Sequence, residues 1–345
     1  TIQTSGLHRT EQEIGKQGAA KAFLAGGNLH YSFKGFHVGA TGIFYSYSLP
    51  LYPDKSQLYK RFAPEGKSFW NMSVDYGYVS HRLTMQGETA MGDCSVVATV
   101  NSMSYLFSEK WSLLALYRFY PYRYYAMYSN SFKAGSDVQD ESGGYVGMRW
   151  TPSAKWMVEA YGDVAYFAWP KYHTTGSTYA MDYLVSAVCQ LSSFISMGAR
   201  YQYKWKNEAT TQRARLYLRM NRSAWSSKTQ VDATWLSGSR GYMASEAFAY
   251  RYRWLRLQAS MGYFHTSDYD SRVYALEPGM LYTMSFGSYF GEGFRCALLA
   301  KVDVGSHWLL ACKWAMTQYF DRNHISSGLQ QINGSCQSDL ELQLK

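Results

Sequence analysis

The feature that most constrains this chain is an alternation of apolar and polar side chains, which recurs in segments of about ten residues. One segment places Trp70, Met72, Val74, Tyr76 and Tyr78 at every second position, between Asn71, Ser73, Asp75 and Gly77. After a short turn near Ser80-His81 the alternation resumes with Leu83 and Met85. Because successive side chains of a strand point to opposite faces, this pair of segments predicts a β-hairpin with one apolar face.

A second pair of segments shows the same alternation with charges along one row. The apolar row consists of Ile195, Met197, Ala199, Tyr201, Tyr203 and Trp205, followed by Ala214, Leu216, Leu218 and Met220. The other row consists of Ser196, Gly198, Arg200, Gln202 and Lys204, followed by Arg213, Arg215, Tyr217 and Arg219. A helix would distribute these charges over every face, so the pattern favours strands.

The connections between segments fall into two groups. Short ones are predicted near Lys34-Gly35, Ser80-His81, Ser108-Glu109-Lys110, Pro152-Ser153-Ala154, Ser192-Ser193, Arg222-Ser223, Arg253-Trp254 and Ser306-His307. The others cover Ser48 to Lys67, Pro121 to Ser142, Trp169 to Thr178, Asp268 to Ser271 and Asp321 to Ser335, and most are longer and rich in Gly, Pro, Asp and Asn. Short turns at one end and long loops at the other are typical of outer-membrane barrels, whose turns face the periplasm.

Composition agrees with such a barrel. Aromatic residues make up 17% of the chain, yet the mean hydropathy is −0.33, and no stretch approaches the roughly 18 apolar residues of a membrane helix. A barrel wall combines these properties, because lipid-facing residues alternate with polar ones and aromatic rings gather at the two interfaces. A soluble β-sandwich is the alternative, but it would not expose an apolar row on nearly every hairpin.

We therefore predict an all-β fold, a large antiparallel up-and-down transmembrane β-barrel in a Gram-negative outer membrane. Roughly nineteen strands are expected between Ala22 and Lys345, with residues 1–345 forming one barrel domain. The chain opens at Thr1 without a signal peptide and is interpreted as a fragment that lacks its N-terminal strands and any periplasmic domain. Because single-chain bacterial barrels have an even number of strands, an odd number is expected before Thr1.

Three stretches carry a resemblance to a known family: Gly6 to Glu11, Tyr263 to Arg272 and Ser326 to Asn333. They resemble the C-terminal barrel of Bacteroidota outer-membrane proteins that contain a helix-hairpin-helix domain, and the likeness runs through essentially the whole chain. The resemblance implies a signal peptide, a periplasmic helix-hairpin-helix region and then a long barrel, of which the later part is present here. The helix-hairpin-helix residues lie outside this sequence, so no DNA-contacting position is carried over, and the family leaves the function open.

The polar rows predict the charged residues of the barrel interior. They are Asp75, Glu88, Arg118, Glu159, Asp163, Arg200, Lys204, Arg213, Arg215, Arg219, Lys228, Asp232, Glu246, Arg256, Lys301, Asp303, Lys313, Asp339 and Glu341. Both signs recur, which favours a lattice of cross-strand ion pairs, with an aqueous pore for anionic solutes as the alternative. Positive charge is concentrated in a basic wall of Arg200, Lys204, Arg213, Arg215, Arg219 and Lys228, for which Asp232 is the nearest opposite charge.

Other chemistries find little support in the sequence. Two predicted exterior loops hold polar clusters, namely His265, Asp268, Asp270 and Arg272 in one and Asp321, Arg322, Asn323 and His324 in the other. Neither has the EF-hand spacing of a calcium site, and the Ser267 region has no nucleophile signature. Five scattered cysteines form neither a disulfide framework nor a zinc motif. No catalytic residue, metal or cofactor is predicted, and the runs Tyr120 to Tyr125 and Trp169 to Tyr172 are interpreted as aromatic girdle and loop base.

Three functions follow as hypotheses. The first is a non-enzymatic pore, transporter or export-assembly component. The second is a structural barrel with a filled interior that anchors a periplasmic nucleic-acid-binding domain or a bound partner, and the third is an outer-membrane hydrolase. The expected partners are outer-membrane lipid and other outer-membrane or periplasmic proteins. Nucleic acid is not expected as a partner of this segment, because its net charge of +9 is scattered without basic runs.

Overall fold

The computed structural model describes residues 10–206, 208–305 and 307–345, so the predictions on Gly6 to Arg9 and Ser306 fall outside the described residues. The chain divides into two compact units. Unit 1 comprises Thr1–Met148 with Tyr161–Met181, and unit 2 comprises Arg149–Ala160 with Asp182–Lys345. The described part of the chain is nearly all β, with one short helix, α1 (Glu11–Gly15), whose N-terminus is capped by Thr10. None of the described helices is long and apolar enough to span a bilayer.

Across the described residues, 17 strands belong to one antiparallel sheet. Unit 1 holds β1 (Ala22–Phe33), β2 (Phe36–Leu51), β3 (Gly66–Val79), β4 (Leu83–Gly92), β5 (Val97–Ser108) and β6 (Trp111–Tyr120), each paired with the next. Strands β7 (Glu141–Ser153), β8 (Trp156–Phe167) and β9 (Thr178–Gln190) contribute residues to both units. Unit 2 holds β10 (Ile195–Lys206), β11 (Ala209–Asn221), β12 (Trp225–Leu236), β13 (Ser239–Tyr252), β14 (Leu255–Thr266), β17 (Glu292–Val304), β18 (Trp308–Tyr319) and β21 (Cys336–Leu344).

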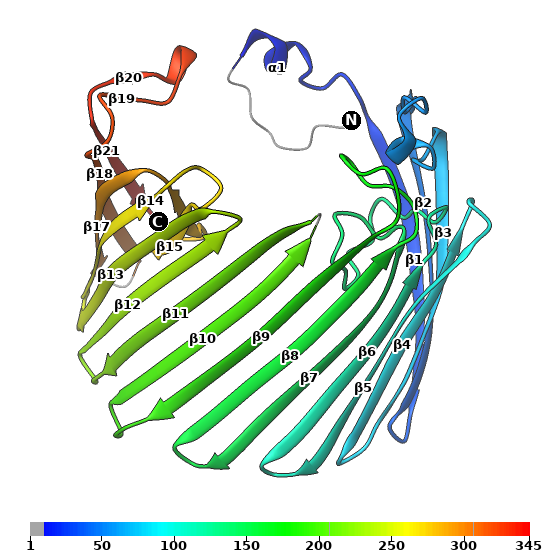
Figure 1. The fold of residues 1–345 in the computed structure, drawn as a ribbon, viewed down its shortest axis with the longest axis horizontal. Helices are drawn as coiled ribbons and strands as arrows, with labels where there is room; N and C mark the ends of the chain where they lie inside the picture. The colour runs from blue at the N-terminus through cyan, green and yellow to red at the C-terminus, as the bar shows by residue number, and fades with distance from the viewer. Residues whose placement is uncertain (1–9, 207, 306) are drawn as a thin grey trace. The chain divides into compact units, whose positions relative to one another are not determined.

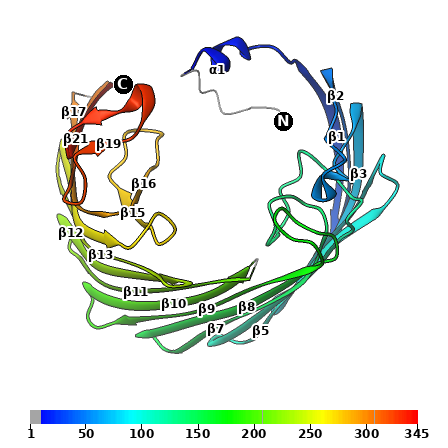
Figure 2. The same cartoon turned by 45° about the horizontal axis from the view of Figure 1, so that its top comes forward.

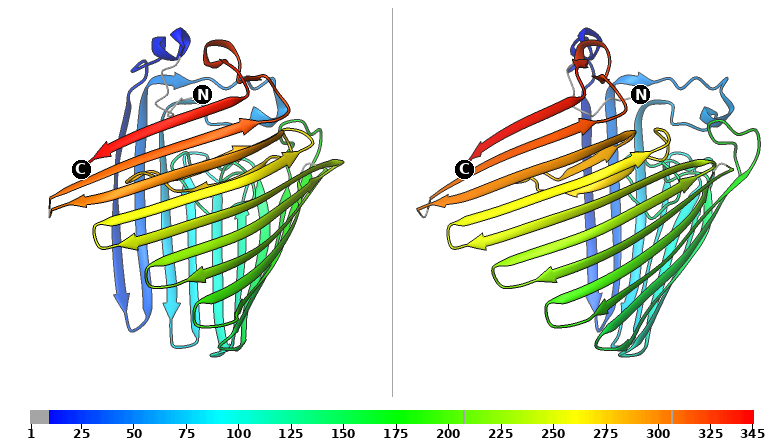
Figure 3. Two further views of the ribbon diagram at one scale, coloured as in Figure 1. Left: turned by 90° about the vertical axis from the view of Figure 1, so that its left-hand side faces the viewer. Right: turned by 60° about the vertical axis from the view of Figure 1, so that its left-hand side comes forward.

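Consecutive sheet strands in unit 2 also pair antiparallel. Figure 1 shows β10 to β13 running side by side, and Figure 3 shows β17, β18 and β21 continuing this arrangement toward the C-terminus. The up-and-down antiparallel fold class predicted from the alternation is therefore confirmed. The sequence predicted roughly nineteen strands; the described residues form 21, and four of these lie outside the sheet.

Those four strands form two small hairpins within connections. One hairpin consists of β15 (Val273–Glu277) and β16 (Ser285–Tyr289), between β14 and β17. The other consists of β19 (His324–Ile325) and β20 (Ile332–Asn333), between β18 and β21. The second hairpin lies within the connection predicted from Asp321 to Ser335. The first lies beyond the connection predicted from Asp268 to Ser271, so the connection after β14 is longer than the sequence predicted.

The short connections adopt the tight geometry that their residues favour. Between β1 and β2, Lys34 and Gly35 both have positive φ, at 47° and 86°. This left-handed pair is typical of the two-residue turn whose twist matches that of the flanking strands. Ser237 and Gly238, between β12 and β13, repeat the pattern with φ of 35° and 101°. This second turn lies at the same end of the strands as the long loops, so that end has connections of mixed length.

One face of each unit is an exposed apolar surface. In unit 1, Met72 opposes Met91, and Val74 stands two positions along the same face. Met72 is 59% exposed and Leu29 of β1 is 80% exposed. In unit 2, Leu216 belongs to the predicted apolar row and is 61% exposed. Side chains this apolar and this exposed match the lipid-facing band of an outer-membrane barrel.

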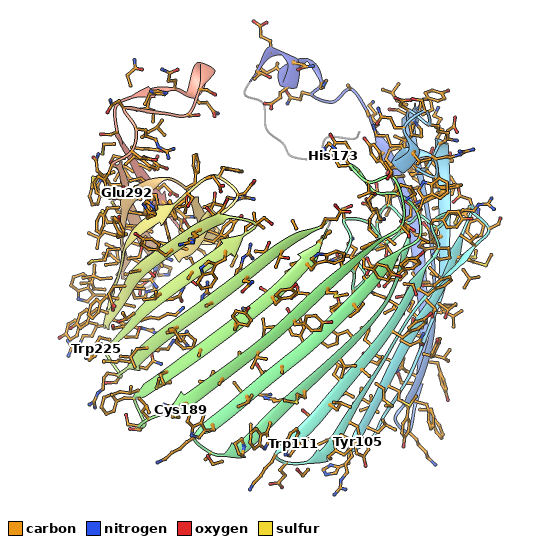
Figure 4. The ribbon with its side chains drawn as sticks, viewed as in Figure 1. Tyr105, Trp111, His173, Cys189, Trp225 and Glu292 are labelled. Carbon is orange, nitrogen blue, oxygen red and sulfur yellow. The ribbon has the colours of Figure 1, made fainter. Side chains whose placement is uncertain are left out.

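Aromatic side chains mark the turn end of the strands. Tyr105 and Trp111 lie beside the β5–β6 turn of unit 1 (Figure 4). In unit 2, Trp225 lies at the turn end of β12, and Glu292 lies at the opposite, loop end of β17 (Figure 4). Aromatic rings at strand ends are typical of a membrane–water interface.

The buried core lies on the other face, between the sheet and the segments folded onto it. In unit 1, Ala98 and Tyr120 of the sheet pack against Tyr124 and Val138 of the β6–β7 loop. In unit 2, Met243 and Phe264 pack against the β15–β16 hairpin, which Figure 2 shows beside β12 and β13. Tyr120 and Tyr124, predicted as girdle or loop base, are therefore core residues of the loop's base and not part of a lipid-facing girdle.

Candidate functional site

The six residues of the basic wall lie on one face of β10, β11 and β12. Arg200 directly opposes Arg215, and Arg219 directly opposes Lys228. Arg213 and Lys204 share this face, because they stand two and four residues from Arg215 and Arg200 on the same strands. The apolar residues between them, such as Leu216 and Leu218, point to the opposite face. The register therefore brings together all six basic residues that the sequence grouped.

Only two of the six have an acidic partner. The Arg215 Nε donates to Asp232 Oδ1 at 2.6 Å, and the Lys204 Nζ lies 3.4 Å from Asp182 Oδ2. Among the described residues, no carboxylate lies within ion-pair distance of the remaining four, which are Arg200, Arg213, Arg219 and Lys228. Asp182, which the sequence reasoning missed, follows the parity of Ala180 and Leu184, the buried side of β9.

A cavity of about 280 Å³ lies between this wall and the β15–β16 hairpin. Arg200, Arg213 and Arg215 line one side. Tyr274 and Phe286 line the other and stack on each other, with ring centroids 5.5 Å apart and planes 10° apart. The cavity thus combines positive charge with an aromatic surface. All of its lining residues belong to unit 2.

A buried ion cluster holds the hairpin against the sheet. Both carboxylate oxygens of Glu277 accept hydrogen bonds from Arg295, Oε1 from Nε at 2.8 Å and Oε2 from Nη2 at 2.9 Å. The Tyr289 hydroxyl also donates to Glu277 Oε1. The Lys313 Nζ lies 3.9 Å from Glu277 and 3.4 Å from Glu341. Lys313 and Glu341 were predicted as interior charges, and they form an ion pair.

Glu277 and Arg295 were not predicted as interior charges. Arg295 has the same parity as Lys301 and Asp303 on β17, so extending that row by three alternations would have found it. Glu277 lies in a connection, where alternation carries no information about the sheet. No sequence signal placed its carboxylate beside Arg295.

A second buried ion cluster occurs in unit 1. The Arg118 side chain is fully buried and donates to both oxygens of Asp163, Nη1 at 2.7 Å and Nη2 at 3.0 Å. Its Nε donates to Glu141, which also accepts from the backbone N–H groups of Ala134 and Gly135. Arg118 and Asp163 were predicted as interior charges. Glu141 stands where the β6–β7 loop becomes β7, and was missed.

Three loops of unit 1 form one packed layer at the loop end. The Trp169 Nε1 donates to the Leu58 carbonyl at 2.8 Å, and its backbone N–H donates to Asp140 Oδ1 at 2.9 Å. The Gln139 Nε2 donates to the Phe62 carbonyl at 3.0 Å. His173, labelled in Figure 4, belongs to the same loop as Trp169. Trp169 therefore fastens neighbouring loops together, consistent with its prediction as a loop base.

Several other predicted interior charges are also paired. Arg256 Nη2 donates to Asp303 at 2.6 Å, and Glu159 lies 3.5 Å from Arg149. Lys301 Nζ donates to the Gly279 carbonyl at 3.0 Å. Asp75 and Glu88 are an exception, because these two carboxylates directly oppose each other, with His30 Nδ1 3.7 Å from Asp75. Asp339 lies 3.9 Å from Arg295.

The prediction that Glu246 faces the interior is wrong. Glu246 opposes Thr229 on β12 and Met261 on β14. Thr229 in turn opposes Leu218, so Glu246 belongs to the apolar face. Its carboxylate accepts hydrogen bonds from the hydroxyls of Ser227 and Thr229, both at 2.5 Å. These hydrogen bonds satisfy the carboxylate. The aromatic residues at alternate positions of the same strand determine which face Glu246 occupies.

The acidic side chains of the two predicted exterior clusters bond to nearby residues of unit 2. Asp268 accepts from the Ser239 hydroxyl and from the Ser271 backbone N–H, and these hydrogen bonds lower the pKa of its carboxyl group. Asp321 pairs with Arg322 at 2.8 Å, which lowers the pKa of Asp321. Within the described ranges, no three His, Cys, Asp or Glu residues are placed to hold a metal ion. All five cysteines are free thiols.

Comparison with known proteins reaches only the level of the fold. No protein-family model matches the chain, and no curated protein matches its sequence. Among solved structures it is similar to the FrpB iron transporter of Neisseria meningitidis in its apoprotein form, with a TM-score of 0.51, 8% identity, and coverage of 94% of this chain and 64% of that one. It is also similar to the ferric-catecholate import receptor Fiu of E. coli K12, with a TM-score of 0.48, 6% identity, and coverage of 94% and 66%.

The likeness to the iron transporter has a direct structural consequence. The chain spans 64% of that transporter's length and shares its fold. Together with the exposed apolar face and the strand topology, this shows an outer-membrane β-barrel located in the outer membrane.

Proposed function

We propose that this protein forms a pathway for anionic solutes across the outer membrane, as a pore or transporter. The observation that carries the proposal is the group of four basic residues without acidic partners, Arg200, Arg213, Arg219 and Lys228. In an outer-membrane barrel the polar face lines the interior, where water and solutes pass. Uncompensated positive charge on such a wall attracts anions and repels cations.

The charge pattern is more specific than the fold. Elsewhere on the polar face, basic side chains such as Arg118, Arg256 and Arg295 contact carboxylates, as an ion-pair lattice requires. The basic wall departs from this lattice over a continuous patch of three strands. A wall that served only for structure would gain from acids opposite these residues, because like charges directly across a sheet are destabilising. The local excess of positive charge therefore favours a role in binding anions.

A filled, anchoring barrel is the second candidate. The observation that favours it is the amount of chain folded onto the polar face, namely the β6–β7 loop in unit 1 and the β15–β16 hairpin in unit 2. Both are held by buried ion pairs, through Arg118 and through Glu277. A barrel filled in this way could serve to hold a periplasmic domain or a partner protein.

Ion selectivity in planar bilayers tests the proposal. We expect anion-selective conductance, and a clear loss of that preference when Arg200, Arg213 and Arg219 are all replaced by Gln. Arg222→Gln is the matched control, because Arg222 lies at a turn outside the wall, over the Phe194 ring. Preference for cations in the unmodified protein would contradict the proposal. Absence of conductance would favour the anchoring barrel.

A further inference from the structure

We infer that the cavity between the basic wall and the β15–β16 hairpin binds a small organic anion with a flat ring, of the class of aromatic carboxylates. This inference deepens the proposed function and rests on it, since the ligand would reach the cavity along the same anion pathway. Two sides of the cavity carry the inference. One supplies guanidinium groups and the other supplies stacked rings.

The charged side of the cavity has a deficit of anions. Arg200 and Arg215 stand directly opposite each other on β10 and β11, an arrangement that destabilises a sheet unless an anion lies nearby. The acid lining the cavity is Asp232, and it is already engaged by Arg215 Nε at 2.6 Å and Gln230 Nε2 at 2.5 Å. Arg200 and Arg213 therefore retain guanidinium donors for a ligand. Such donors match the two oxygens of a carboxylate.

The apolar side of the cavity is built before any ligand arrives. Tyr274 and Phe286 face the cavity from the two strands of the hairpin and stack nearly parallel. The Arg272 Nε donates to the Tyr274 hydroxyl at 2.7 Å, which fixes that ring. Glu277, at the end of β15, holds the same hairpin to Arg295 of the sheet. Because the rings are already ordered, a ligand ring loses little binding free energy to reorganisation of the protein.

The cavity's size limits the ligand to one ring. Its volume of about 280 Å³ is just below the range of roughly 300–1,000 Å³ typical of drug-sized ligands. The sheet supplies most of the polar groups and the hairpin supplies the aromatic surface, so a ligand needs both a charged group and an apolar part. A single-ring carboxylate therefore matches the cavity in volume, charge and shape.

Isothermal titration calorimetry of the purified full chain in detergent tests the site, with benzoate, acetate and benzylamine as probes. Benzoate should bind saturably and about tenfold more tightly than acetate, because its ring gains an aromatic contact that acetate lacks. Benzylamine, which has the ring but the opposite charge, should not bind. Arg213→Gln should weaken benzoate binding at least about tenfold, as expected for the loss of a charged hydrogen bond. Phe286→Leu should lower the ratio of benzoate affinity to acetate affinity.

Controls separate this site from folding effects and from the proposed function. Arg222→Gln should leave benzoate affinity unchanged, and Arg213→Lys, which keeps the charge, should retain more affinity than Arg213→Gln. The inference is overturned if benzoate does not bind saturably, or if neither Arg213→Gln nor Phe286→Leu changes its affinity. Anion-selective conductance without benzoate binding would reject the site and leave the pathway standing. Benzoate binding in a cation-selective barrel would reject the pathway and leave the site.

Discussion

At the scale of single residues, the side of the sheet decides what a substitution does. Leu218 and Arg219 are neighbours on β11 and point to opposite faces, toward Thr229 and Lys228 of β12. Leu218→Arg places a charge on the lipid face and should cost about 2–4 kcal/mol in a bilayer near its midplane. Arg219→Leu removes a charge that has no acidic partner and should cost less. Equilibrium unfolding in lipid vesicles compares the two, and equal losses would contradict the assignment of faces.

The sequence also predicted best which side chains of a strand share a face. Where apolar and charged residues alternate strictly, as around Arg215, the register places the two predicted rows on opposite faces of the sheet. Around Glu246 the inward row consists of Met243 and small residues, and the outward row contains the carboxylate itself. There the expectation that a charge avoids lipid gave the wrong face. Hydroxyls on the neighbouring strand satisfy Glu246, and no single-strand pattern reveals them.

At the scale of elements, the β15–β16 hairpin should lose stability in acid. Burial disfavours the charged form of Glu277, but the hydrogen bonds from Arg295 and Tyr289 outweigh it and lower the pKa of this carboxyl. A folded-state pKa below the ordinary value, roughly 4.3, gives stability that is present above that value and is lost as pH falls through the lowered pKa. The protection factors of the amide hydrogens of residues 273–289, taken relative to the intrinsic exchange rate at each pH, should therefore fall in acid.

Glu277→Gln provides the test of this cause. The variant should show low protection factors in the hairpin at all pH values, because the ion pair with Arg295 is absent throughout. Asp54→Asn is the control, since Asp54 also has a lowered pKa, through hydrogen bonds from Ser56, but lies exposed in a loop of unit 1. Hairpin protection factors that depend on pH in the Glu277→Gln variant as they do in the unmodified protein would refute the role of this carboxylate.

The positions of the connections were predictable at this scale, but their folding was not. Gly, Pro, Asp and Asn identified the long connection after Pro121 because these residues favour turns. Its inward packing depends on Tyr124 and Val138 meeting the sheet and on Glu141 meeting Arg118. These contacts join the loop and the start of β7 to β5 and β6. They follow from tertiary packing, which local turn preference does not encode.

At the scale of the whole molecule, the orientation in the membrane predicts which loop ends are accessible from outside. Asp54 follows β2 at the loop end, and His81 lies in the three-residue turn after β3, so a full strand separates the two positions. Turns of outer-membrane barrels face the periplasm and loops face the exterior. In a background with the five free cysteines replaced by Ala, Asp54→Cys should react with an impermeant reagent on intact cells. His81→Cys should react only after the outer membrane is permeabilised.

The packed loops sharpen this experiment. Gln139 was predicted to lie outside, at the same end as Asp54, but its side chain donates to the Phe62 and Tyr122 carbonyls, and the adjacent Asp140 is only 4% exposed. Gln139→Cys should therefore react more slowly than Asp54→Cys although both lie on the exterior side. Labelling at 81 but not at 54 on intact cells would invert the orientation. Equal rates at 139 and 54 would instead keep the orientation and contradict the packed loop layer of unit 1.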